Sequence, residues 1–136
     1  MTTTLWLRIS SVIALLFAAG HALGGRSDWS PMADNPVIDS MRTVPFQVMG
    51  VTRTYLDFYL GFGYSIAVTQ VMMAVILWQL AGLARTDARR IRPIIAVITL
   101  ASVLGAAIAW HFILPLPAFF SLVLTATLAI AYAVAR

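Results

Sequence analysis

Residues 53–85 read RTYLDFYLGFGYSIAVTQVMMAVILWQLAGLAR, and this stretch decides the fold of the chain. No charged residue occurs between Asp57 and Arg85, so the apolar run exceeds the roughly 20 residues that cross a hydrocarbon core. Three other segments have a similar character. Backbone groups in lipid must be satisfied within the segment, so each is predicted to be a helix. The predicted helices cover residues 5–23, 46–84, 92–114 and 116–135, with a loop at 24–45.

The composition supports a membrane protein. The chain has 136 residues, of which 61% are hydrophobic and only 10% are charged, whereas a soluble domain is nearer a quarter charged. It contains no cysteine, which excludes disulfides, thiolate metal sites and cysteine nucleophiles. The arginines flank apolar segments instead of alternating with aromatic residues, so nucleic acid is not an expected partner. We predict a single all-α domain, a polytopic four-helix transmembrane bundle.

The arginines also predict the orientation of the bundle. Four of them fall between the second and third helices, where Asp87 is the only acid, and Arg136 ends the chain. The loop at 24–45 has a mixed charge. The positive-inside rule therefore predicts that both termini and the second-to-third loop are cytoplasmic.

Polar and aromatic side chains gather at the opposite, outer end of the predicted bundle. An ionisable residue within a membrane helix is a functional candidate by default, while tyrosine and tryptophan also occur as ordinary interfacial anchors. The predicted substrate-binding residues are Arg53, Tyr55, Tyr59, Tyr64, Trp29 and Trp110, and the predicted catalytic residues are Asp57, His21 and His111. No metal ligands are predicted.

The pair formed by Arg53 and Asp57 is the centre of this prediction. If the second helix begins near Pro45 or Phe46, these two residues share a helical face with Gly61 and Tyr64. That stripe would line a pocket open to the outer leaflet. Arg53 would hold Asp57 ionised or bind an anionic head group, and Asp57 with a histidine would supply general acid–base chemistry.

The external loop contains a second predicted element. Asn35 is suited to N-cap a short helix with Pro36 at its first position. Val37, Ile38 and Met41 would then share an apolar face, as in a helix that lies on a membrane surface. We interpret this helix as a lid over the outer end of the bundle.

Three classes of function remain open. The first is a binder of a lipid-like amphiphile, or an isomerase, cyclase or hydrolase acting on one without a cofactor. The second is a redox protein for quinone or for haem b, with His21 and His111 as axial ligands. The third is a structural or accessory subunit, or a small transporter that works as a homo-oligomer. The sequence does not decide whether the protein is an enzyme.

A resemblance adds to this reading. GHALGG at 20–25, RTYLDFYLGFGY at 53–64 and the turn LPLP at 114–117 occur in that order along nearly the whole chain. In this combination the chain resembles a bacterial family of small four-helix integral membrane proteins whose activity is uncharacterised. The resemblance implies the four-helix topology and a location in a bacterial inner membrane, and it implies no activity.

Overall fold

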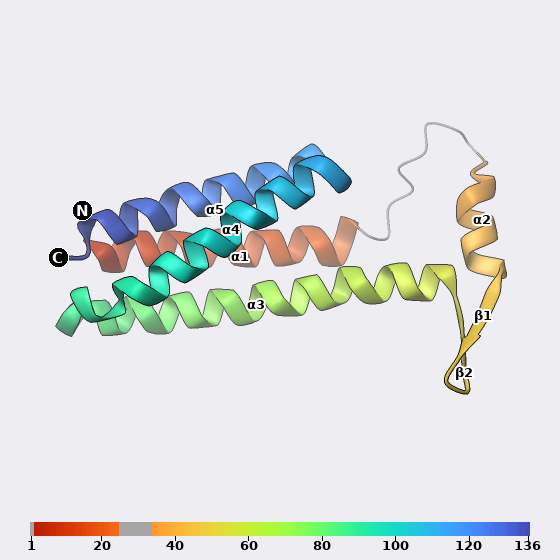
Figure 1. The fold of residues 1–136 in the computed structure, drawn as a ribbon, viewed down its shortest axis with the longest axis horizontal. Coiled ribbons are helices and arrows are strands. Elements are labelled where there is room, and N and C mark those ends of the chain that lie inside the picture. Colours follow the sequence, from red (N-terminus) through yellow and green to blue (C-terminus); the bar gives the residue numbers. More distant parts are fainter. Residues whose placement is uncertain (1, 25–33) are drawn as a thin grey trace. The chain divides into compact units, whose positions relative to one another are not determined.

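The fold is that of a computed structural model, which describes residues 2–24 and 34–136. It is mostly helical, with one small antiparallel β-hairpin (Figure 1). In chain order the elements are α1 (Thr3–Gly24), α2 (Pro36–Thr43), β1 (Pro45–Val48), β2 (Val51–Thr54), α3 (Tyr55–Asp87), the 3-10 turn η1 (Arg89–Ile91), α4 (Arg92–Phe112) and α5 (Pro115–Val134).

Four of these helices are long and apolar enough to cross a membrane. They are α1, α3, α4 with the preceding 3-10 turn, and α5. The prediction of four long apolar helices is confirmed. The helices predicted at 5–23, 92–114 and 116–135 differ from the observed α1, α4 and α5 by only a few residues at their ends.

The predicted start of the second long helix is wrong. Residues 45–54 form the hairpin, and α3 begins only at Tyr55. The two residues of the turn both have positive φ, +53° at Met49 and +78° at Gly50, as a two-residue hairpin turn of the I′ type requires. Glycine adopts this conformation easily and a helix does not contain it, so the helix cannot extend back through Gly50 to Phe46. Arg53 therefore lies on β2, outside the helix on which it was expected to share a stripe with Asp57.

The short helix in the loop is confirmed as α2. The side chain of Asn35 accepts hydrogen bonds from the backbone N–H groups of Val37, at 3.1 Å, and Ile38, at 3.4 Å. Pro36 occupies the first turn, where its missing N–H leaves no hydrogen bond unmade. The exposed ion pair between Arg42 and Asp39, at 3.7 Å, lies on the same helix. A role as a lid stays a prediction.

The chain divides into two compact units, residues 1–17 with 70–136, and residues 18–69. In the first unit α4 and α5 pack side by side (Figure 1). Its core is aliphatic and includes Leu7, Leu77, Ile95 and Leu128, each with no exposed surface. Lipid is as apolar as these side chains, so their contribution in a membrane is close packing and not escape from water.

Buried hydroxyl groups join the helices of the first unit. The Oγ atoms of Ser10 on α1 and Thr127 on α5 lie 2.8 Å apart. Ser11 Oγ donates to the backbone carbonyl of Ala74 on α3 at 2.7 Å. Small hydroxyl residues allow helices to approach closely and hydrogen-bond across the contact, so these contacts connect α1 to both α3 and α5.

Two arginines of the first unit lie over aromatic rings. The guanidinium carbon of Arg8 is 4.9 Å from the centre of the Trp78 ring, and that of Arg92 is 4.4 Å from the centre of the Tyr132 ring. A cation at this distance from the face of a ring is attracted to it. Each pair joins two helices, α1 with α3 and α4 with α5.

Candidate functional site

The junction between β2 and α3 is closed by a reciprocal pair of hydrogen bonds. The backbone N–H of Thr54 donates to Asp57 Oδ2 at 2.9 Å, and the backbone N–H of Asp57 donates to Thr54 Oγ1 at 3.2 Å. This is a capping box, in which the side chains of the residue before the helix and of its third residue satisfy each other's N–H groups. Asp57, predicted as a catalytic acid or base, thus has a structural task at the start of α3.

Arg53 is exposed, and within the described residues its guanidinium makes a single hydrogen bond. Nη1 donates to the carbonyl of Thr52 at 2.7 Å, which uses one of the five N–H donors of the side chain. Within the described residues Arg53 forms no ion pair closer than 4 Å with a carboxylate. The predicted Arg53–Asp57 pair is therefore not an ion pair at that distance.

The register of the hairpin separates apolar from polar side chains. Directly paired residues of two antiparallel strands point to the same side. The pairs Phe46↔Arg53 and Val48↔Val51 share one side, and Pro45↔Thr54 and Gln47↔Thr52 share the other. We call the side of Phe46, Val48, Val51 and Arg53 the apolar face of the hairpin. It combines three apolar side chains with one cation.

A row of aromatic rings continues from the apolar face along α3. The Phe46 ring lies 5.2 Å from that of Tyr55 and 5.7 Å from that of Phe58, and the Phe58 ring lies 4.8 Å from that of Phe62. Tyr55, Phe58 and Phe62 are all at least half exposed. We call these four residues the aromatic row. Its three phenylalanines were not among the predicted site residues.

The open surface beside the aromatic row extends to Gly61. A Cβ atom built on this glycine would contact no atom within 4 Å. Tyr59 and Tyr64, predicted as binding residues, lie on the same part of α3 and are both exposed. Trp29, the remaining candidate from the loop, lies outside the described residues.

The predicted histidines lie in different units. His21 is half-buried in α1, within residues 18–69. In the other unit His111 is exposed in the last turn of α4, with its ring edge-on to Phe112 at 4.4 Å, next to Trp110, which is 75% exposed. Their approach to Asp57 and their use as haem ligands stay predictions. Within the part of the chain that the structure describes, no three His, Asp, Glu or Cys residues cluster as a metal site would require.

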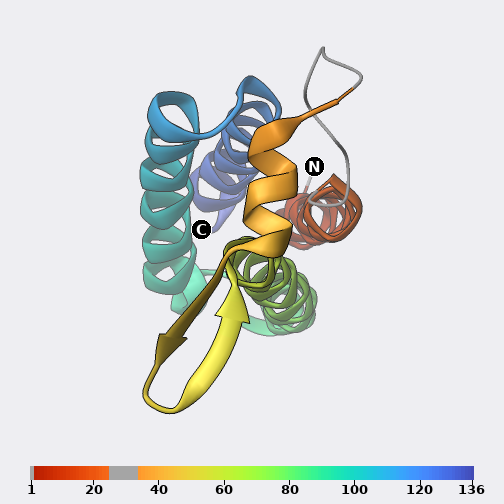
Figure 2. The same ribbon diagram turned by 90° about the vertical axis from the view of Figure 1, so that its right-hand side faces the viewer.

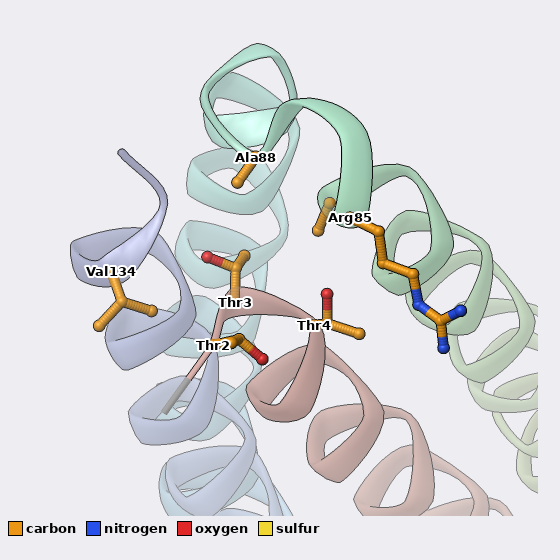
Figure 3. Close-up of a pocket in the computed structure, with 7 residues that line it drawn as sticks. Thr2, Thr3, Thr4, Arg85, Ala88 and Val134 are labelled. Atoms are coloured by element: carbon orange, nitrogen blue, oxygen red, sulfur yellow. The ribbon is translucent and has the colours of Figure 1, made fainter.

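A depression of about 560 Å³ lies in the first unit, and none of the predicted site residues lines it. Figure 3 shows the threonines of the N-terminal turn, Ala88 and Val134 around it, with the Arg85 side chain extending away from Thr3. The lining residues are Thr2, Thr3, Thr4, Ala84, Arg85, Ala88 and Val134. The start of α1, the α3–η1 connection and the end of α5 thus meet at one end of this unit.

Comparison with known proteins gives no relative. No protein-family model matches the chain, and neither a curated protein nor a solved structure shows significant similarity to it. The resemblance to a bacterial family of four-helix membrane proteins therefore stays a prediction, and the function has to be argued from the site.

Proposed function

We propose that this protein is a multi-pass membrane protein that binds a lipid-like amphiphile with an anionic head group at the outer end of α3. The observation that carries the proposal is the pairing of Arg53 with Phe46 across the hairpin, which places the cationic residue beside the first ring of the aromatic row. An amphiphile needs a charged contact for its head and an apolar surface for its chain. Arg53 supplies the first through charge-assisted hydrogen bonds, and Phe46, Phe58 and Phe62 supply the second.

Binding is favoured over catalysis because of the capping box. The Oδ2 atom of Asp57 accepts the Thr54 N–H and the Asp57 N–H donates to Thr54 Oγ1, which gives this residue a structural role at the start of α3. The hydrogen bonds of Thr54 and Asp57 instead fix the angle at which β2 enters α3. In the proposed site Asp57 is a positioning residue that holds Arg53 beside Phe46.

The orientation predicted from the arginines is part of the proposal. The meeting of α1, the α3–η1 connection and α5 at one end of the first unit supports a common side for both termini and the Arg-rich connection. We assign that side to the cytoplasm on the positive-inside rule. The junction at Thr54 then belongs to the outer side.

Binding can be tested with a matched pair of arginine variants. The full chain is purified in mild detergent, and a titration with phosphatidylglycerol is followed by native mass spectrometry. Arg53→Gln should weaken binding several-fold, whereas Arg42→Gln should leave it unchanged, because Arg42 is already paired with Asp39. Equal binding by the wild type and both variants, or equal losses in both variants, would refute the assignment of Arg53.

A further inference from the structure

We infer that the β-hairpin docks flat on the outer surface of the bilayer, with its apolar face against lipid. This inference depends on the proposed insertion of α3 into a membrane but not on the binding of an amphiphile. The partner is a lipid surface, contacted by Phe46, Val48 and Val51 on the apolar face and by Met49 in the turn. Arg53, on the same face, would contact lipid phosphate groups.

The length of α3 puts the hairpin at the level of the head groups. Asp57 and Arg85 are 28 positions apart, which corresponds to about 42 Å along a helix that rises 1.5 Å per residue. A bilayer with its head-group regions is about 40–45 Å thick. The two charged residues therefore fit the two polar surfaces, and β2 ends at Thr54, only three residues before Asp57.

The direction of the hairpin keeps it at this level. Figures 1 and 2 both show that, within residues 18–69, α2 and the hairpin run across the axis of the first part of α3. If α3 crosses the membrane, the strands run along the membrane surface. No linker separates Thr54 from Tyr55, and the capping box fixes the junction, so the hairpin cannot move far from that surface.

The aromatic row shows which side of the hairpin faces the membrane. Phe46 contacts not only Tyr55, the first residue of α3, but also Phe58, almost one turn further along the helix. The side of the hairpin that carries Phe46 therefore faces the first turns of α3. If α3 crosses the membrane, this is the side that faces the bilayer. Val48 and Val51 share that side and extend it toward the turn.

The exposure of the apolar tip is explained by this arrangement. Met49 is 98% exposed, Val48 57% and Val51 46%. A contiguous exposed apolar patch on a protein marks a contact with a partner or a membrane. Gln47 and Thr52, on the opposite side of the same strands, would remain in water. Membrane-surface elements divide their side chains in this way, and the cationic side chain of Arg53 can reach the phosphate level.

The absence of cysteine from the chain permits a site-specific test. Single-cysteine variants of the full chain are labelled with the fluorophore NBD and placed in vesicles of phosphatidylcholine and phosphatidylglycerol. Val48→Cys tests the apolar face, and the adjacent Gln47→Cys is its matched control. NBD emission and its quenching by doxyl-labelled lipid and by aqueous iodide are measured for each.

NBD at position 48 should emit at shorter wavelength, be quenched by doxyl lipid and be protected from iodide. NBD at position 47 should show the reverse. Equal iodide quenching at both positions, or protection at 47 alone, would overturn the inference. Val75→Cys, at a half-exposed position of α3, serves as the reference for insertion. Iodide access at 75 would refute membrane insertion itself, while lipid quenching at 75 without protection at 48 would refute only the docking.

Discussion

Replacing Ser10 by Ala should remove the hydrogen bond between the hydroxyl groups of Ser10 on α1 and Thr127 on α5, and should leave no buried hydroxyl without a partner. Two hydroxyl protons serve three contacts here, those from Ser10 to the carbonyl of Trp6, from Ser10 to Thr127, and from Thr127 to the carbonyl of Leu124. Each hydroxyl can donate only one proton. Whichever hydroxyl donates across the interface, the other donates to a carbonyl of its own helix. Ser10→Ala therefore leaves Thr127 hydrogen-bonded to Leu124.

The expected loss of unfolding free energy is therefore small. Hydrogen bonds between membrane helices contribute about 0.6 kcal/mol on average and up to about 1.7 kcal/mol. A buried hydroxyl left without a partner would add a larger penalty, but neither single variant creates one. Ser10→Ala and Thr127→Val should each lower the free energy of unfolding by about 0.6 kcal/mol, roughly threefold in the unfolding equilibrium. The double variant should cost little more than either single one.

This cycle can be measured by unfolding the protein with increasing SDS in mixed micelles and following helix content by circular dichroism. Ser102→Ala is the matched control, because Ser102 Oγ donates at 3.0 Å to the carbonyl of Ile98 in its own helix. It should leave stability nearly unchanged. Strictly additive losses from Ser10→Ala and Thr127→Val would refute the interhelical bond, as would an equal loss from Ser102→Ala.

Three further predictions follow from the structure. Thr54→Ala should destabilise the start of α3 by about 1 kcal/mol, seen as faster amide exchange in its first turn, and unchanged exchange would contradict the capping box. Alkaline phosphatase should be inactive when fused after Arg136 and active when inserted after Asp34, and the reverse pattern would overturn the proposed orientation. Arg92→Gln should lower the free energy of unfolding by about 0.5–2 kcal/mol, measured by SDS titration, because the contact with Tyr132 is lost. Arg92→Lys keeps the cation and should cost less, and equal losses in both variants would contradict a cation–π contribution.

The long helices could be predicted from the sequence because few structures satisfy the backbone in lipid. Hydropathy alone placed α1, α4 and α5 within a few residues of their observed ends. The predicted start of α3 is wrong because residues 45–54 are only moderately polar and adjoin an apolar run. The signals for a hairpin were present, since Phe46 and Val48 alternate with Gln47 and Gly50 allows a tight turn. These signals cover only two four-residue strands, and a short strand pattern next to a long apolar helix is difficult to distinguish from an extension of that helix.

The capping role of Asp57 could also have been predicted from the sequence. Thr54 and Asp57 have the spacing of a capping box immediately before a long apolar run. The interpretation as an Arg53–Asp57 ion pair required both residues to lie on one helix, and it depended on the wrong helix start. The aromatic row could not be predicted in the same way. The contact between Phe46 and Phe58 depends on the angle between β2 and α3, which is a tertiary feature without a local sequence signal.

The separation of Arg53 from Asp57 has a consequence for what the protein binds. Asp57 Oδ2 accepts the Thr54 N–H in the capping box, and within the described residues Arg53 forms no ion pair with a carboxylate at 4 Å or less. Arg53 carries its charge on the apolar face of the hairpin, and within the described residues its guanidinium makes one hydrogen bond, to the carbonyl of Thr52. An exposed cation on the same face as Phe46 and two valines can bind an anion of another molecule through charge-assisted hydrogen bonds. In the proposed site this anion is the head group of an amphiphile, whose chain would lie along the aromatic row.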